Sequence, residues 1–304
     1  MQEYDIIIIG GGPAGLTAAL YARRAGKTVL LLEKATFGGQ ATFSPKIENY
    51  PGIAAISGND LADKLIEQVL ALGAEVELEE VVGLHTEGDE KIVISEYNKY
   101  RAKSVIIAAG AKHRRLGLPG EDNLVGEGIS YCATCDGAFY AGQTVGIVGG
   151  GNSALQEAIL LSEICKKVYI IQNLDYLTGE CRLAELLKTK PNVEIILGTV
   201  VKSLLGNTSL NGVILKREAD GSEFRLSLDG LFVAIGLAPE NDVFRECARL
   251  DKTGYIISGE SCVTDTPGIF AAGDCRTKTV RQITTACADG TVAAIAACNY
   301  IDRM

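Results

Sequence analysis

Residues 6–15 read IIIIGGGPAG, and this stretch decides the fold. Four consecutive isoleucines predict a buried strand. The Gly-x-Gly-x-x-Gly pattern after them is typical of the turn between a strand and a helix that binds a dinucleotide. A second apolar segment, residues 29–32, ends at Glu33, which lies 23 residues beyond the first glycine, where such units place a ribose-binding acid. Residues 4–33 are therefore predicted to form a β-α-β unit that binds a dinucleotide.

Each glycine of the Gly-x-Gly-x-x-Gly pattern has a physical role in this turn. Gly10 permits the tight turn, Gly12 lets the backbone approach a pyrophosphate, and Gly15 lets the helix pack closely against the sheet. The helix, predicted over residues 14–25, presents its N-terminus to the phosphates. Glu33 is expected to accept hydrogen bonds from ribose hydroxyls.

A second stretch, VGIVGGGNSA at residues 145–154, repeats the pattern with alanine in the last glycine position. Its second strand, residues 168–171, ends at Gln172, again 23 residues after the first glycine of the turn. NAD selectivity needs an acid at this place and NADP selectivity needs a nearby arginine, but residues 172–174 read QNL. A charge-assisted contact contributes roughly 1.5–3 kcal/mol, so losing two or three weakens binding about a hundredfold or more. The second turn is thus either a remnant of the fold or a nucleotide site with substitute contacts.

Between the two units lies Cys132-Ala133-Thr134-Cys135. This spacing is typical of half a zinc site or of a redox-active dithiol. The chain has no second Cys-x-x-Cys and only two histidines, His85 and His113, which favours the dithiol. Asp136 follows directly and is placed to exchange a proton with a thiolate, although an Asp before a glycine also suits a solvated turn.

The composition excludes several classes of protein. The 304 residues suffice for two domains, and 47% apolar with 22% charged residues is typical of a folded globular protein. A net charge of −9 argues against nucleic-acid binding. No apolar run reaches the roughly 20 residues of a membrane span, and Met1 leads straight into a strand, so we expect no signal peptide and a cytoplasmic protein.

The order of the motifs predicts an α/β fold with two Rossmann-like (three-layer ββα) dinucleotide-binding domains, the second inserted into the first. The first dinucleotide-binding domain is predicted over residues 1–115 and 243–304. A domain of NAD(P)H-binding type that carries the cysteine pair is predicted over residues 116–242. Two connections of this kind are suited to act as a hinge.

The chain resembles a known family, the low-molecular-weight thioredoxin reductases, over nearly its whole length. The shared segments are GGGPAG (10–15), GGQ (38–40), ENYPG (48–52), AGA (109–111), CATCD (132–136), GDCR (273–276) and RQ (281–282). The resemblance implies FAD, a homodimer, and a rotation of the inserted domain that alternately presents the cysteines to the flavin and to thioredoxin.

The resemblance also implies a set of site residues. The catalytic residues would be Cys132, Cys135 and Asp136, with no metal. The FAD-binding residues would be Gly10, Gly12, Pro13, Ala14, Gly15, Glu33, Gly39, Gln40, Asn49, Ala109, Gly110, Gly273, Asp274, Arg281 and Gln282.

The chain departs from the family at the nucleotide site of the inserted domain. NADPH-dependent members carry His-Arg-Arg-x-x-x-Arg where residues 172–178 here read QNLDYLT. This is similar to the ferredoxin-dependent flavin thioredoxin reductases. The basic run KHRR at residues 112–115, together with Arg276, Lys278 and Arg281, suggests a surface for an acidic ferredoxin, or simply a solvated basic face.

The predicted function is a flavoenzyme that passes electrons from reduced ferredoxin through FAD to Cys132 and Cys135, and from them to the disulfide of thioredoxin. By the resemblance, Cys135 faces the flavin, Cys132 attacks the substrate and Asp136 manages the proton. One alternative is an NADPH-dependent thioredoxin reductase with a divergent nucleotide site. Another is a flavin redox sensor without turnover. Flavin-linked NADP–ferredoxin reductases share the two-domain plan but lack the dithiol.

Overall fold

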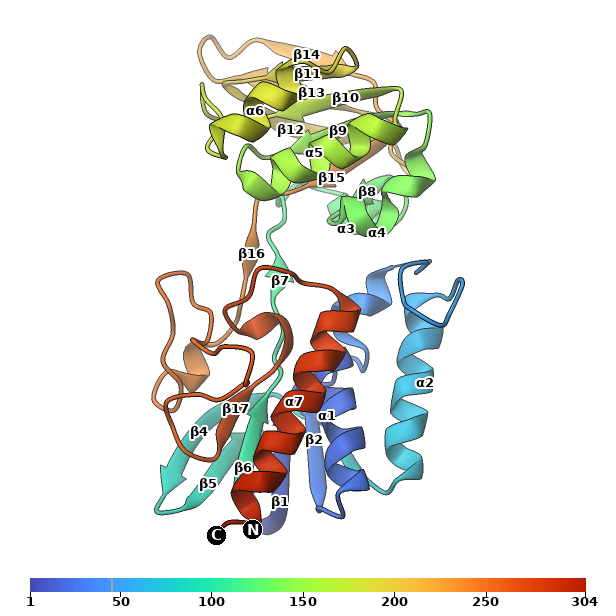
Figure 1. Ribbon diagram of the computed structural model, residues 1–304. Coiled ribbons are helices and arrows are strands. Elements are labelled where there is room, and N and C mark those ends of the chain that lie inside the picture. Colours follow the sequence, from blue (N-terminus) through green and yellow to red (C-terminus); the bar gives the residue numbers. More distant parts are fainter. Residues whose placement is uncertain (45) are drawn as a thin grey trace. The chain divides into compact units, whose positions relative to one another are not determined.

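The protein, as a computed structural model, is described over residues 1–44 and 46–304. Pro45, in the predicted glycine- and proline-rich loop, lies outside the described residues. The chain divides into two compact units, Met1–Lys112 with Ala238–Met304, and His113–Leu237 (Figure 1). The sequence placed these breaks after residues 115 and 242. They fall earlier because the two connecting segments, β7 (Lys112–His113) and β16 (Leu237–Ala238), pair as a two-stranded ladder.

The first unit is built on a seven-stranded sheet in the order β3-β2-β1-β6-β5-β4. Its strands are β1 (Gln2–Ile9), β2 (Val29–Glu33), β3 (Glu75–Leu78), β4 (Val81–Glu87), β5 (Glu90–Ser95), β6 (Lys99–Ile107) and β17 (Ile269–Ala271). One edge of β6 is shared: its first half pairs antiparallel with β5 and its second half pairs parallel with β17. The C-terminal strand β17 thereby returns to the domain that the chain had left.

Three helices pack on one face of this sheet: α1 (Pro13–Arg24), α2 (Gly58–Ala71) and α7 (Ile283–Ile301). Figure 1 shows α7, from the end of the chain, beside α1, from its beginning. The two helices approach closely at Gly290, where a Cβ atom would lie 2.2 Å from the Ala14 carbonyl oxygen. Short 3₁₀ turns complete the unit: η1 (Gly39–Phe43), η3 (Asp242–Phe244) and η4 (Gly273–Cys275).

The second unit repeats the plan. A parallel sheet in the order β11-β10-β9-β15-β8 is accompanied by an antiparallel sheet in the order β12-β13-β14. The strands are β8 (Ile129–Ser130), β9 (Thr144–Val148), β10 (Lys167–Ile171), β11 (Val193–Ile196), β12 (Thr199–Leu205), β13 (Gly212–Arg217), β14 (Glu223–Leu226) and β15 (Gly230–Val233). The helical segments are α3 (Glu121–Leu124), α4 (Ala133–Asp136), η2 (Gly137–Tyr140), α5 (Asn152–Ile164) and α6 (Cys181–Lys188). The predicted fold class, two Rossmann-like units with the second inserted into the first, is confirmed.

Over residues 1–44 and 46–304, no helix combines the length and the apolar character that a membrane span requires. Within the same ranges, no three side chains of His, Cys, Asp or Glu gather in a way that would hold a metal ion.

Candidate cofactor and disulfide sites

The first glycine turn joins three elements in close contact. Gly10 has φ +110°, and a Cβ atom there would lie 2.3 Å from the carbonyl oxygen of Ala108, just past β6. At Gly15 a Cβ atom would lie 1.8 Å from the Gly10 carbonyl oxygen. Both positions exclude any side chain, so the steric roles predicted for these glycines have a direct basis in the structure.

Gly12 has a different role, because nothing crowds it. It is the N-cap of α1, Pro13 is the first helical residue, and the nearest atom to a Cβ built on Gly12 is the Gly39 Cα at 4.0 Å. The N–H groups of the first helical turn have no partner within the helix. This strip of bare backbone between Gly12 and Gly39 suits the phosphates of a dinucleotide.

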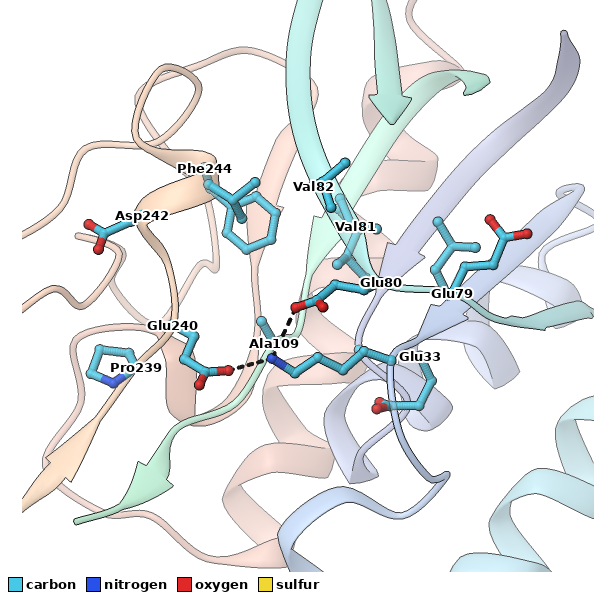
Figure 2. Close-up of a pocket in the computed structure, with 15 residues that line it drawn as sticks. Glu33, Glu79, Glu80, Val81, Val82, Ala109, Pro239, Glu240, Asp242 and Phe244 are labelled. Carbon is cyan, nitrogen blue, oxygen red and sulfur yellow. Dashed lines mark hydrogen bonds and ion pairs between the residues drawn. The ribbon is translucent and has the colours of Figure 1, made fainter. Parts of the chain in front are cut away.

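Glu33, at the end of β2, faces a pocket of about 550 Å³ beside this turn (Figure 2). Its carboxylate oxygens accept hydrogen bonds from the N–H groups of Gly11 at 2.6 Å and Ala35 at 2.9 Å. Lys34 forms ion pairs with Glu80 and Glu240 across the pocket. Gly10, Glu33 and Ala109, three of the predicted cofactor residues, line this one cavity.

Asp274, in η4, carries a buried carboxylate oxygen, Oδ1, with no hydrogen-bond partner among the described residues. Burial raises the pKa of Asp274, while the cations of Lys278 and Arg281 oppose the shift. The Arg281 guanidinium lies 4.4 Å from the ring centre of Tyr255, and its Nε is likewise buried without a partner in this part of the chain. Buried polar atoms are nearly always paired in folded proteins, so both atoms fit a ligand that supplies hydroxyl groups and oxygens.

A buried ion cluster holds this loop in place. Arg276 donates to both carboxylate oxygens of Asp289 in α7, at 2.8 and 2.6 Å, and Lys278 donates to the same carboxylate at 2.9 Å. The Gly273 N–H also donates to it, at 2.9 Å. Burial would raise the pKa of Asp289, but these hydrogen bonds hold it below its ordinary value. The prediction that Arg276 and Lys278 belong to a basic docking surface is wrong, because both are buried against Asp289.

The remaining predicted cofactor residues lie at two further places. Asn49 donates to the side-chain oxygen of Gln282 at 3.2 Å, and Gln282 caps the N-terminus of α7. Gly110 follows β6 with φ +69°. Gln40, in η1, is exposed.

The second glycine turn has the same backbone form. Gly149 has φ +134°, and a Cβ atom there would lie 2.4 Å from the Ala234 carbonyl oxygen, which matches the relation of Gly10 to Ala108. Gly151 caps α5. Gln172 is only 5% exposed and packs on Gly150, and its Nε2 donates to the Tyr176 carbonyl oxygen at 3.4 Å.

The segment after β10 folds back onto this turn. The N–H groups of Thr178 and Gly179 both donate to the Gly150 carbonyl oxygen at 2.8 Å. The Glu180 N–H donates to Oδ1 of Asn152, the first residue of α5, at 2.7 Å. Residues 172–181 contain no Lys or Arg. The helix N-terminus that would face a nucleotide is thus lined by an acidic, arginine-free segment.

Cys132 and Cys135 form a disulfide with their Cα atoms 5.3 Å apart. Cys132 is the N-cap of α4, and its Sγ accepts a hydrogen bond from the Cys135 N–H at 3.2 Å. Both cysteine residues are half-buried. Such a local, partly exposed disulfide on a helical turn is suited to thiol–disulfide exchange.

Asp136 follows Cys135 directly and is the last residue of α4. Its Oδ2 accepts a hydrogen bond from the Ser130 hydroxyl at 2.6 Å, whereas Oδ1 is buried with no partner in the described ranges. Burial raises the pKa of Asp136, and the bond from Ser130 partly offsets this. The Cys132 N–H also donates to Ser130, at 3.1 Å, so this serine links the carboxyl to the cysteine backbone. A carboxyl whose pKa is raised, next to a cysteine pair in the chain, is suited to exchange a proton with a thiolate.

Sequence reasoning missed three residues of these sites: Ser130, Glu157 and Asp289. Ser130 carried no signal. Asp289 did carry one, because a lone acid among the alanines and glycine of an apolar helix must find a buried partner.

The basic run at residues 112–115 is mostly neutralised by its neighbours. Lys112 pairs with Glu240 at 2.9 Å, and Arg115 pairs with Asp122. His113 stacks on Tyr131, and burial lowers its pKa to about 4, so it is neutral at pH 7. The positive charge of the run is therefore reduced to that of Arg114, which is exposed and forms no ion pair among the described residues.

Fold and sites together define a two-domain oxidoreductase with a dinucleotide site and a redox-type disulfide. The chain belongs to the family described as pyridine nucleotide-disulphide oxidoreductase, which it matches over residues 4–290, and within it to the low-molecular-weight thioredoxin reductases. It is 40% identical to the thioredoxin reductase of Treponema pallidum, covering 99% of this chain and 98% of that one. It is also 40% identical to a 34.2 kDa protein in the rubredoxin operon of Clostridium pasteurianum, over 99% and 98% of the two chains. The crystal structure of thioredoxin reductase from Streptococcus pyogenes superposes with a TM-score of 0.94, at 40% identity and with 99% of both chains covered.

Proposed function

We propose that this protein reduces the disulfide of thioredoxin and uses FAD to do so. The observation that carries the proposal is the half-buried Cys132–Cys135 disulfide, followed directly by Asp136, an acid whose pKa is raised by burial. It occurs in a chain whose first glycine turn provides a dinucleotide site. The relatives named thioredoxin reductase, similar over their whole lengths, support the same substrate.

The chemistry of the cysteine pair follows from its surroundings. In the reduced protein the Cys132 thiolate attacks one sulfur of the substrate disulfide, forming a mixed disulfide and releasing a thiolate. The Cys135 thiolate then attacks the Cys132 sulfur of the mixed disulfide, which forms the Cys132–Cys135 disulfide and releases the second substrate thiolate. The N–H of Cys135 stabilises charge on the Cys132 sulfur, and Asp136 gives a proton to a leaving thiolate. FAD, when bound, supplies the electron pair that returns the disulfide to the dithiol.

We propose that FAD is held by the first unit. Gly12 and Gly39, with Pro13 and Ala14 at the start of α1, would hold the pyrophosphate, and Glu33 the adenosine ribose beside the pocket. The partnerless oxygen of Asp274 and the Nε of Arg281 would bind the remaining polar groups of the cofactor. Gln282, with Asn49 on its side chain, would lie beside them.

For the electron donor we propose reduced ferredoxin, which delivers one electron at a time, so two molecules reduce one disulfide. The support is the second nucleotide site. Residues 172–181 hold no cation for a 2′-phosphate, Gln172 replaces the ribose-binding acid, and Thr178 and Gly179 bond to the central glycine of the turn. Surface charge gives no support, since the basic groups that we assigned to a docking face are largely paired or buried.

NADPH is the second candidate donor, and specific observations favour it. The backbone of the second turn, from Gly149 to the Gly151 cap of α5, keeps the form that holds a pyrophosphate. The family that the chain matches is one of pyridine nucleotide enzymes. The homodimer that the family resemblance implies stays a prediction, which light scattering would check.

The donor is tested by anaerobic bleaching of the flavin in the purified protein, with NADPH, NADH and pre-reduced ferredoxin added separately. We expect rapid bleaching by ferredoxin alone. Rapid bleaching at micromolar NADPH would overturn the ferredoxin proposal and leave the thioredoxin reductase proposal intact.

The disulfide is tested separately with Cys132→Ser and Cys135→Ser. Both variants should keep FAD and lose thioredoxin reduction, and full activity in either would disprove the dithiol mechanism. Slow exchange with a stable partner complex in the wild-type protein would instead indicate a redox sensor. Cys181→Ser is the matched control, because Cys181 is an exposed free thiol outside the pair.

A further inference from the structure

A second carboxyl, that of Glu157, lies against the disulfide segment. Glu157 is on α5, three residues after Ala154 and four before Leu161, both fully buried, so it shares the inward face of the helix. This face packs against α4 and against η2, where Gly137, the residue after Asp136, lies against Leu161. A charged side chain at such a position needs a partner.

The partner of Glu157 is the backbone of the cysteine turn. Its carboxyl accepts a hydrogen bond from the N–H of Ala133, the residue directly after Cys132. Its other oxygen, Oε2, is buried and has no hydrogen-bond partner among the residues that the structure describes. Within the described ranges, no Lys, Arg or His forms an ion pair with this carboxyl. Burial raises the pKa of Glu157 to about 7, and the bond from Ala133 partly opposes the shift.

The elements packed against Glu157 contribute few other titratable groups. On the disulfide side these are Cys132, Cys135 and Asp136 of the cysteine turn, and Tyr140 in η2, whose pKa is raised by burial. Helix α6 faces α5 with Ala184 and Leu187, while its charged residues are exposed. Strand β9 carries no ionisable residue. The charge nearest to the cysteine turn on α5 is therefore that of Glu157 itself.

We propose that Glu157 is a positioning residue of the redox-active disulfide: it fixes the start of the Cys-x-x-Cys turn through Ala133, and its charge sets how readily the reduced pair forms a thiolate. Reduction breaks the S–S bond, takes up two electrons, and gives one thiol and one thiolate with one proton, or two thiols with two. An ionised Glu157 opposes the thiolate, whereas a protonated Glu157 does not. The protonation of Glu157 and the redox state of the pair are thereby coupled.

This inference rests on the proposed redox role of the pair. Its tests use dithiothreitol as the reductant, so they are independent of the electron donor and of thioredoxin. Failure of the proposed function would appear as absent turnover, and failure of this inference would appear as an unchanged pH profile.

The first test follows the alkylation of Cys132 and Cys135 by iodoacetamide as a function of pH. The reduced protein is used after removal of dithiothreitol, and the peptides are resolved by mass spectrometry. Glu157→Gln keeps the shape and the acceptor for Ala133 but cannot ionise. We expect it to match the wild type below about pH 6 and to react about three- to tenfold faster at about pH 8, because the opposing charge is gone.

The matched control is Glu163→Gln on the same helix, an exposed residue that pairs with Lys190. Its profile should superpose on that of the wild type. A wild-type profile for Glu157→Gln would overturn the proposal, as would an equal shift in the Glu163→Gln control.

A second measurement uses the wild-type protein alone, so it tests the proposal even if Glu157→Gln does not fold. In wild-type protein labelled with carbon-13 at the glutamate carboxyl, one signal should titrate with a midpoint of about 7. Asp136 is invisible in this experiment. The midpoint should rise when the disulfide is reduced, because a thiolate nearby disfavours a second negative charge. The proposal fails if no glutamate titrates near neutral pH, or if its midpoint is the same in both redox states.

Discussion

The two glycine turns of this chain have the same backbone form, but they differ in the rim, by which we mean the end of the second strand and the loop after it. Gly10 and Gly149 both lie against a carbonyl oxygen of the neighbouring strand end. A side chain from the end of the second strand lies on each middle glycine: Glu33, the last residue of β2, lies on Gly11, and Gln172, the residue after β10, lies on Gly150. The first of these side chains is an acid beside a pocket, and the second is a buried amide that donates a hydrogen bond to its own loop.

The difference separates what the fold requires from what a ligand requires. Steric contact between the strand ends and the helix preserves the glycines in both units, whether or not a nucleotide binds. Apart from Gly15, which the second unit replaces with Ala154, the differences lie in groups that would touch the ligand, at the end of the second strand and in the loop after it. A glycine fingerprint therefore identifies the fold, and the rim residues identify the ligand.

The first unit also has a buried ionic support for its loop that the second lacks, and removing it should have the largest effect. Asp289→Asn leaves Arg276 and Lys278 buried without their carboxylate, which costs about 3–5 kcal/mol. We expect an unfolding midpoint in urea well below that of the wild type, and loss of FAD on purification. In the described part of the second unit, every ion pair includes an exposed carboxylate, such as Glu185. Glu185→Gln, which removes the pair with Lys188, is the control and should change stability by less than about 1 kcal/mol.

This support also depends on pH in a definite direction. The pKa of Asp289 is lowered in the folded protein, so its contribution is fully present above the unfolded value of 3.8 and is lost as pH falls through the folded value. The stability difference between wild type and Asp289→Asn should therefore be constant at neutral pH and shrink below about pH 4. If the stability difference between wild type and Asp289→Asn became smaller as the pH rose from about 5 to about 8, the direction predicted here would be wrong.

The second prediction tests the steric half of the comparison. Gly15→Ala places a methyl group 1.8 Å from the Gly10 carbonyl oxygen, and the backbone must move to accommodate it. We expect a loss on the order of 3 kcal/mol and a protein purified without flavin colour. The second unit already carries alanine at the matching position, Ala154, which is fully buried. Ala154→Gly should keep its flavin and lose only about 1–2 kcal/mol.

Much of this could be predicted from sequence, for physical reasons that particular residues show. Strands and helices around the glycine turns have strong periodic patterns, so the fold class and the inserted order followed directly. The breaks between the units were placed too late, because the pairing of β7 with β16 is a long-range contact with no local signal. Arg276 and Lys278 looked like surface charge because their partner, Asp289, lies more than ten residues away in a helix whose apolar character hides it.

The third prediction concerns the missing positive charge at the second nucleotide site, which two substitutions would supply. Asn173 and Leu174 are exposed, so Asn173→Arg with Leu174→Arg adds two cations without disturbing the core. Two charge-assisted contacts to the 2′-phosphate should tighten NADPH binding about a hundredfold and leave NADH binding unchanged. Titration calorimetry measures both. No gain for NADPH would mean that the segment from Thr178 to Glu180, and not the missing charge, closes the site.

The last prediction exchanges the two rim side chains and should have the smallest effect. Glu33→Gln gives the first turn the amide of the second. The bond from the Gly11 N–H then becomes a neutral one, and the side chain keeps a single oxygen acceptor where the carboxylate has two. Since a hydrogen bond to a charged group is stronger than a neutral one by about 1 kcal/mol, FAD affinity should fall about fivefold, with the fold intact.

Gln172→Glu, the reverse change in the second unit, should leave FAD affinity unchanged. Fluorescence titration of the apoprotein with FAD measures both variants. If Glu33→Gln binds FAD with the affinity of the wild type, then the exchange of a carboxyl for an amide does not explain why the two turns differ in ligand binding. The difference would lie in the loops, where Gly39 leaves the first turn bare and Gly179 lies against the start of α5.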